Sequence, residues 1–166
     1  MSQEHLLVVP GNHDVDWGAS MAAYTVMRSA EAPERSVERY QNPGNRDYVE
    51  IVTDEVAYER RFANYADFHQ RATGREYSLH AARQFEVVAS RDESVVVVGL
   101  NSARHLDHYF TKRARIDPDA LSGALGALGL PAGAPAKPPH VVFVWHHPVV
   151  GPESLDDSSF MQQLAV

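Results

Sequence analysis

Three short apolar segments of this chain each run directly into polar side chains that are costly to bury. Residues 6–9 (LLVV) lead through Pro-Gly into Asn12-His13-Asp14, residues 95–100 (VVVVGL) lead into Asn101-Ser102, and residues 141–145 (VVFVW) lead into His146-His147. An apolar run of this length is typical of a strand that is buried on both faces. Ligands of α/β proteins gather at the carboxyl ends of such strands, so we expect the three ends to meet in a single site.

The rest of the chain predicts helices between the strands, and one hairpin. Residues 17–30 and 47–73 have helix-compatible patterns, residues 31–45 predict a loop with room for a short helix, and Asp117-Pro118-Asp119 is a strong helix start. Residues 84–89 and 95–100 are expected to pair across the polar SRDES turn. This alternation indicates an α/β layered fold with a mixed sheet. An aromatic stripe at helical spacing is expected to pack in the core; it comprises Tyr58, Phe62, Tyr65 and His69.

Composition narrows the class of protein further. The 166 residues suit one domain, and the net charge of −7 argues against a nonspecific nucleic-acid binder, which needs a basic face. The absence of cysteine excludes disulfides, thiolate metal sites and a cysteine nucleophile. No apolar run has membrane-spanning length and no signal-like segment begins the chain, so we expect a soluble, cytoplasmic protein. The early first strand and the unterminated final helical pattern lead us to expect a piece of a longer chain.

The residue types at the strand ends fit a metal site. The Asn12 amide oxygen is a neutral, hard ligand, and the His146 imidazole accepts many first-row metals. His13 followed by Asp14 is suited to act as an acid–base pair, in which the carboxylate orients the imidazole. For Asn101-Ser102, an ordinary transition from strand to loop is an equally good interpretation.

The segments "VVPGNHDVD" and "VVFVWHHP" resemble two of the five motifs of the calcineurin-like metallophosphoesterases. The intervening segments "RFANYADFHQRATG", "VVVVGLNSA" and "RIDPDAL" are similar to bacterial members of that family. The resemblance implies an α/β double-sheet sandwich flanked by helices, of which residues 1–166 would be the central part and residues 31–74 a helical cap or insertion. It also implies a phosphate ester substrate and two divalent metal ions, such as manganese, iron or zinc.

The resemblance also implies roles for individual residues. Asn12 and His146 would ligate a metal ion. His13 would contact the phosphate and protonate the leaving oxygen, and Asp14 would hold His13. We expect substrate contacts from three further residues near the strand ends: Asn101, His105 and His147.

Three motifs of the family are missing from this chain. Asp-x-His and Gly-Asp-x-x-Asp would precede "GNHD", and Gly-His-x-His would follow the last residue. Asp67-Phe68-His69 matches the first by letters, but its helical context excludes it, and Ala114 stands where a glycine usually precedes "RID". We therefore expect a phosphomonoesterase or phosphodiesterase with an incomplete site, which binds one metal weakly at most and is inactive alone.

A non-catalytic reading stays open beside the enzymatic one. A degenerate or split module of this kind would act by associating with another chain, or with itself, through exposed sheet edges. Residues 6–9 and 95–98 are the strands that we expect to be most exposed in such a piece. Substrate identity also stays open, because nucleotides, cyclic nucleotides, phospholipids and phosphoproteins are distinguished by loops and caps.

Overall fold

The computed structural model describes residues 5–27, 37–41, 44, 47–92, 94–128, 139–151, 153–156 and 160–164. The helices are α1 (Trp17–Ala22), α2 (Glu55–Glu59), α3 (Ala63–Thr73), α4 (Pro118–Ala127) and α5 (Phe160–Leu164). Short 3-10 turns are η2 (Asn12–Asp14), η4 (Arg60–Phe62) and η5 (Ala81–Arg83). The strands are β1 (Tyr24–Met27), β2 (Val37–Gln41), β3 (Tyr48–Thr53), β4 (Phe85–Ala89), β5 (Val95–Leu100) and β6 (His140–Val144).

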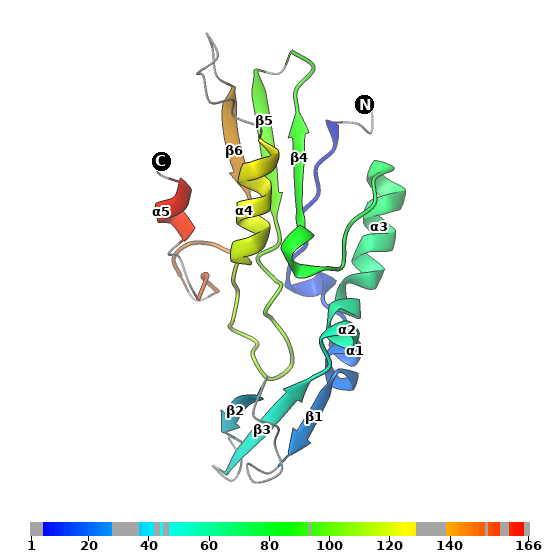
Figure 1. Ribbon diagram of the computed structural model, residues 1–166, viewed down its shortest axis with the longest axis vertical. Coiled ribbons are helices and arrows are strands. Elements are labelled where there is room, and N and C mark those ends of the chain that lie inside the picture. The colour runs from blue at the N-terminus through cyan, green and yellow to red at the C-terminus, as the bar shows by residue number, and fades with distance from the viewer. Residues whose placement is uncertain are drawn as a thin grey trace.

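The upper sheet of Figure 1 has the order β4-β5-β6 and is mixed, as the sequence predicted. Strands β4 and β5 form the expected antiparallel hairpin, and β6 lies parallel to β5. The hairpin turn is held by Asp92, whose carboxylate accepts hydrogen bonds from the Ser90 and Ser94 hydroxyls at 2.7 and 2.8 Å. The expectation that residues 95–98 are exposed is wrong, because β5 is the central strand and Val98 is fully buried.

Different elements cover the two faces of this sheet. Helix α4 lies over the face that carries Phe85, where Gly123 meets the Phe85 ring. On the other face, Leu7 and Val9 pack against Gly99 of β5. Residues 6–9 therefore form a covering segment and not the regular strand that the sequence predicted. Side chains of the α3 region bind its carbonyls: Arg75 donates to Leu6 O, and the Tyr65 hydroxyl donates to Val8 O at 2.8 Å.

The second sheet consists of residues that the sequence analysis assigned to helix or loop. It has the order β1-β3-β2, with both pairings antiparallel. Helix α1 ends at Ala22, where residues 24–27 begin β1, so the predicted helix over 17–30 is wrong in its described second half. The predicted loop over 31–45 contains β2, and the predicted helix over 47–73 begins with β3. Residues 28–36, 42–43 and 45–46 lie outside the described residues.

These errors have a common physical cause. The segments TVM and YVEIVT are rich in β-branched residues, which favour an extended chain when a partner strand is present. That partner is distant in sequence, because Tyr24 pairs with Thr53. The described part of residues 31–74 therefore contains strands β2 and β3 followed by helices, and is not wholly helical.

The helix start at Asp117, the helix end at Gly74 and the buried aromatic stripe were predicted correctly, because no strand pattern competes with the helical pattern there. Asp117 caps α4 by accepting hydrogen bonds from the Asp119 and Ala120 N–H groups at 2.9 and 3.1 Å. Gly74 ends α3 in a left-handed conformation with φ of 74°. The aromatic stripe is buried as predicted; its members are Tyr58, Phe62, Tyr65 and His69.

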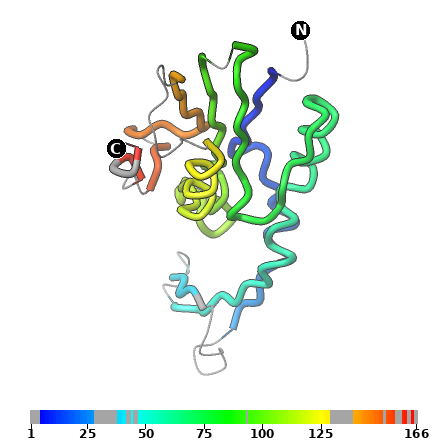
Figure 2. Tube along the Cα trace, turned by 45° about the horizontal axis from the view of Figure 1, so that its top comes forward, coloured from blue at the N-terminus to red at the C-terminus, as the bar shows by residue number. Residues whose placement is uncertain are grey.

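The two sheets lie at opposite ends of the long axis of the molecule, with α1, α2 and α3 along one side (Figure 1; Figure 2 shows the same separation after rotation). They do not stack face to face, so the double-sheet sandwich implied by the resemblance is not seen. What the structure has is an α/β fold with two small sheets and flanking helices. No helix in the described ranges is long and apolar enough to cross a membrane.

Candidate functional site

The turn after residues 6–9 is held by its own backbone and by one carboxylate. Asp14 Oδ2 accepts a hydrogen bond from Gly11 N–H at 2.8 Å, and Asp14 N–H donates to Gly11 O at 3.1 Å. Gly11 also lies against the ring of His146. A Cβ atom at position 11 would be 2.9 Å from three ring atoms, which is closer than real Cβ contacts. The absence of a side chain at Gly11 thus lets the turn approach β6.

This approach brings together two residues that the sequence analysis proposed as metal ligands. His146 Nε2 lies 3.2 Å from Asn12 Oδ1, although the two residues are 134 positions apart. His146 follows β6 and is exposed, whereas Asn12 is half-buried in η2. The ends of two apolar segments therefore meet, as expected for chemistry at the carboxyl end of a sheet.

Ser102 connects the ends of β5 and β6. The fully buried Ser102 Oγ accepts hydrogen bonds from the His146 and His147 N–H groups at 3.2 Å each, and lies 2.8 Å from His147 Nδ1. With both acceptor positions in use, the Ser102 hydroxyl donates its proton to Nδ1. This assigns His147 the tautomer with the proton on Nε2. Burial, followed by the neighbouring His146, lowers the pKa of His147, so its imidazole is neutral at neutral pH.

A cavity of about 340 Å³ lies beside Asn12 and His147. Asn12, His147 and Lys112 line it, together with Leu106, Thr111, Ala114, Glu153 and Ser154. Lys112 supplies a cation and His147 a neutral N–H donor, and both are suited to a bound anion. Ser102 was expected at one of the three strand ends but without a role of its own, and Lys112 was not among the predicted site residues. The signal for Ser102 was its place directly after a buried strand, whereas nothing local marks Lys112.

His13 and Asp14 lie apart from that cavity. His13 is exposed and lines a shallow hollow with Asp16, Asn64 and Phe68. The Asp14 carboxylate binds Gly11 N–H, and no hydrogen bond links it to His13 in the described part of the chain. The structure thus places His13 on the same turn as Asn12 but does not show the expected pair of Asp14 and His13.

The two other residues predicted to contact substrate have different surroundings. Asn101 is buried; its Nδ2 donates to Gln84 Oε1 at 2.8 Å and its Oδ1 accepts from Ala103 N–H at 2.8 Å. The Asn101 side-chain amide therefore holds the start of the loop that follows β5 in place. His105 lines a second cavity beside Arg104, away from Asn12. Burial, followed by the positive charge of Arg104, lowers the pKa of His105 to about 4.

Asp67-Phe68-His69 matches the Asp-x-His motif by letters only. Its side chains make contacts within the fold, in agreement with its exclusion as a metal-binding motif. His69 is buried in α3, and its Nε2 lies 3.2 Å from Glu86 Oε2, on the sheet face that residues 6–9 cover. The Asp67 carboxylate is exposed and pairs with Arg71 at 3.1 Å. The side chains of Asp67 and His69 therefore do not point to a common site.

Asn12 and His146 have a spacing that suits one metal ion. Bonds of about 2.1 Å that meet at 90° to 109° place two ligand atoms about 3.0–3.4 Å apart. The observed 3.2 Å between Asn12 Oδ1 and His146 Nε2 lies within that range. Among the described residues, however, no group of three or more histidine, cysteine, aspartate or glutamate side chains could hold a metal. At this contact the described residues thus offer a pair of neutral ligands, Asn12 and His146.

No protein-family model, curated protein or solved structure matches this chain.

Proposed function

We propose that this chain belongs to a metal-dependent phosphoric ester hydrolase of the metallophosphoesterase type, and that it supplies part of the metal site. The observation that carries the proposal is the contact of 3.2 Å between Asn12 Oδ1 and His146 Nε2. The two atoms come from distant segments whose sequences resemble two metal-binding motifs of that family. Either a phosphomonoester or a phosphodiester suits this chemistry.

The residues around Asn12 and His146 have distinct roles in this proposal. When bound, divalent ions polarise a phosphoryl oxygen and lower the pKa of bound water. Lys112 attracts the phosphate into the adjacent cavity, and the Nε2–H of His147, oriented by Ser102, donates to a phosphate oxygen. The resemblance assigns protonation of the leaving oxygen to His13, which lies on the same turn as Asn12 but lines a separate hollow, so in this conformation it does not line the cavity. Gly11 keeps the His146 ring close to Asn12.

The incomplete ligand set limits what this chain does by itself. Asn12 and His146 are both neutral, so two adjacent dications would repel each other with little compensation. We expect the 166-residue chain to bind one metal ion weakly at most and to hydrolyse phosphodiesters negligibly. A longer version that carries Asp-x-His and Gly-Asp-x-x-Asp segments should gain activity dependent on manganese or iron.

Elemental analysis together with a chromogenic phosphodiester assay on both versions tests the proposal. Asn12→Ala and His146→Ala should each remove most of the activity of the longer version, whereas His80→Ala, at an exposed position elsewhere, should not. Two tightly held metals or robust turnover in the 166-residue chain would refute the incomplete site. A longer version without metal-dependent turnover would refute the hydrolase.

A non-catalytic module is the second candidate, and one observation favours it. Val142 of β6 is 46% exposed on the sheet face that Leu7 and Val9 cover only in part. A second copy of the chain could bury this apolar area. Such a module would act by association, with the contact between Asn12 and His146 as a structural remnant.

A further inference from the structure

Two arginines are buried where the loop of residues 101–117 meets α2 and η4. Arg61 is fully buried, and its guanidinium donates to three backbone carbonyls: Tyr58 O, Leu106 O and Arg104 O. Arg61 also lies over the Tyr58 ring, with 3.3 Å from its Cζ to the ring centroid. Its hydrogen bonds tie the loop to the helical side of the molecule.

Arg104 is the second arginine, and its hydrogen bonds are incomplete. Its side chain is buried, with 6% of the residue exposed, and its Nε and Nη1 atoms have no acceptor among the described residues. A buried donor without an acceptor is costly, and more so when it is charged. The Tyr58 ring, 5.1 Å from Arg104 Cζ, partly offsets this cost through a cation–π contact. Both atoms are closed to solvent, so an external acceptor reaches them only after a small shift of the guanidinium toward an adjacent cavity that Arg104 lines.

The nearby carboxylate of Asp107 accepts its hydrogen bonds from groups other than Arg104. Asp107 is fully buried, and one of its oxygens accepts from the Tyr24 and Tyr58 hydroxyls at 2.7 and 2.9 Å. The other oxygen accepts from the Tyr109 and Phe110 N–H groups at 2.8 and 2.9 Å. Asp107 therefore balances one of the two guanidinium charges and has its acceptor positions in use. One positive charge remains in the buried cluster.

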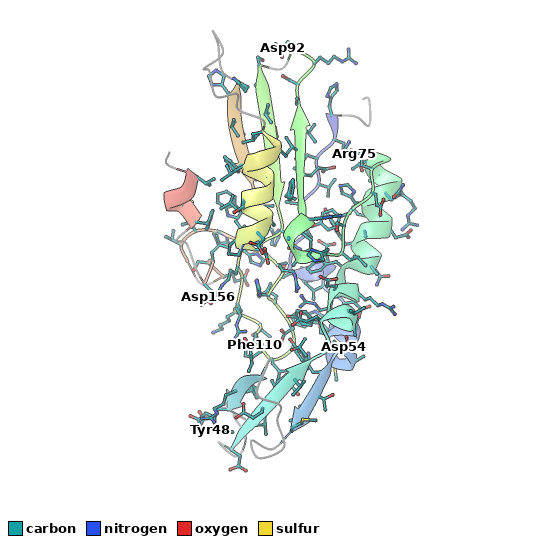
Figure 3. The ribbon with its side chains drawn as sticks, viewed as in Figure 1. Tyr48, Asp54, Arg75, Asp92, Phe110 and Asp156 are labelled. Atoms are coloured by element: carbon teal, nitrogen blue, oxygen red, sulfur yellow. The ribbon has the colours of Figure 1, made fainter. Side chains whose placement is uncertain are left out.

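A cavity of about 390 Å³ opens at this point, between the lower sheet and the loop. Arg104, Arg113 and His105 line it, together with the hydroxyl-bearing Tyr24, Thr53 and Tyr58. The tip of the loop at Phe110 lies just above the lower sheet (Figure 3). Two carboxylates also line the cavity: Glu38 is paired with Arg113 at 2.6 Å, and Glu55 is exposed at the start of α2.

We infer that this cavity binds the phosphate or carboxylate group of a small organic anion, with Arg104 as its anchor. Guanidinium groups recognise both kinds of oxyanion by charge-assisted hydrogen bonds. The volume suits a small molecule and is larger than a single ion needs. The site is separate from the contact between Asn12 and His146. Leu106, Thr111 and Lys112 of the same loop line the first cavity, whereas Arg104, His105 and Arg113 line this one. It does not depend on the proposed hydrolase activity.

Calorimetric titration of the 166-residue protein with inorganic phosphate, and separately with acetate, tests the inference at constant ionic strength. Arg104→Gln should weaken binding by at least about tenfold, because it removes the charged donor, and Arg104→Lys should weaken it less. Arg71→Gln, at an exposed ion pair on α3, is the matched control and should change nothing. Lys112→Gln removes the cation of the first cavity, so phosphate binding that it weakens belongs there, whereas the binding that depends on Arg104 should persist in it. The comparison of phosphate with acetate identifies the preferred oxyanion.

A measurement on the unaltered protein covers the case in which Arg104→Gln fails to fold. Phosphate or acetate should slow amide hydrogen exchange in residues 104–113 at least about threefold more than in α3, if ligand binding stabilises the loop. Saturable binding that Arg104→Gln abolishes supports the site. The absence of binding beyond that of chloride, or equal binding by a folded Arg104→Gln variant, would overturn it.

Discussion

Gly11 determines how closely the Asn12 turn approaches His146. Its φ of −116° is open to any residue, so the backbone does not require glycine there. The requirement comes from the His146 ring, which a Cβ would meet at 2.9 Å. We expect Gly11→Ala to lower the free energy of unfolding by about 1–3 kcal/mol, as overpacking does, and to break the contact between Asn12 and His146. Denaturant unfolding measures the first effect.

A double-mutant cycle provides the control for this change. In a His146→Ala background the ring is absent, so adding Gly11→Ala should cost much less than in the unaltered protein. An equal cost in both backgrounds would show that the substitution acts through another contact.

His105 should make the stability of the protein depend on pH in the acid range. Its pKa is about 6.5 in an unfolded chain and is lowered to about 4 in the folded one, first by burial and then by Arg104. The unfolded state therefore takes up a proton first as the pH falls, and folding stability is lost between pH 6.5 and about 4. The full loss from this group is about 3 kcal/mol.

Urea unfolding at a series of pH values measures this effect. His147 also has a lowered pKa, so the contribution of His105 is the difference between the protein and a His105→Gln variant. His80→Gln, at an exposed position, should keep the full acid dependence. An unchanged slope in His105→Gln would contradict the assignment.

Among individual residues, the meeting of Asn12 and His146 was accessible from sequence, because each directly follows an apolar segment. The cluster of Arg61, Arg104 and Asp107 was not. Its members looked like parts of a helix and a polar loop, and its partners come from β1, α2 and the loop. Burial of a charged residue depends on such long-range partners, which no local pattern records.

Helix α4 offers a comparison of two glycines in one element. A Cβ at Gly123 would lie 2.8 Å from Phe85 Cε1, whereas a Cβ at Gly126 would have no neighbour within 4 Å. Gly126→Ala should raise the free energy of unfolding by about 0.5–1 kcal/mol, because alanine favours the helix. Gly123→Ala gains the same helix propensity but crowds β4, so we expect a net loss of about 1 kcal/mol.

Thermal and denaturant unfolding of the two variants provide the measurement, and each serves as the control for the other. Equal stabilisation by both substitutions would show that Phe85 yields easily and that α4 does not pack tightly on β4. Local helix propensity treats both glycines as equally unfavourable. The sequence could not distinguish them, because the difference lies in the facing strand.

At the level of elements, the sequence predicted the parts that local patterns specify. The β4–β5 hairpin, the start of α4 at Asp117 and the end of α3 at Gly74 are all marked by turn and capping residues. The lower sheet was missed because β1 and β3 are separated in sequence and pair only in the folded chain. Their β-branched residues were the available signal, but adjoining helical patterns obscured it.

The whole molecule leaves one face of its upper sheet partly uncovered. Residues 6–9 pack on this face as a single segment, whose Leu7 and Val9 reach Gly99 of β5. On β6, Val142 lies on the same face as Val97 and is 46% exposed. Leu6, at the start of the covering segment, is 43% exposed. An apolar sheet face of this kind is a site for association.

We therefore expect the 166-residue chain to self-associate at high concentration, with a second copy covering this face. Val142→Lys should shift the equilibrium toward the monomer, because it places a charge where apolar burial drives the contact. Val56→Lys is the matched control, since Val56 is 70% exposed but lies on α2, away from the sheet. Added salt should strengthen association, because the net charge of −7 makes the copies repel one another. Sedimentation velocity over a concentration series measures all four expectations. A stable monomer at high concentration would contradict the non-catalytic candidate, but it would not bear on the proposed metal ligands Asn12 and His146.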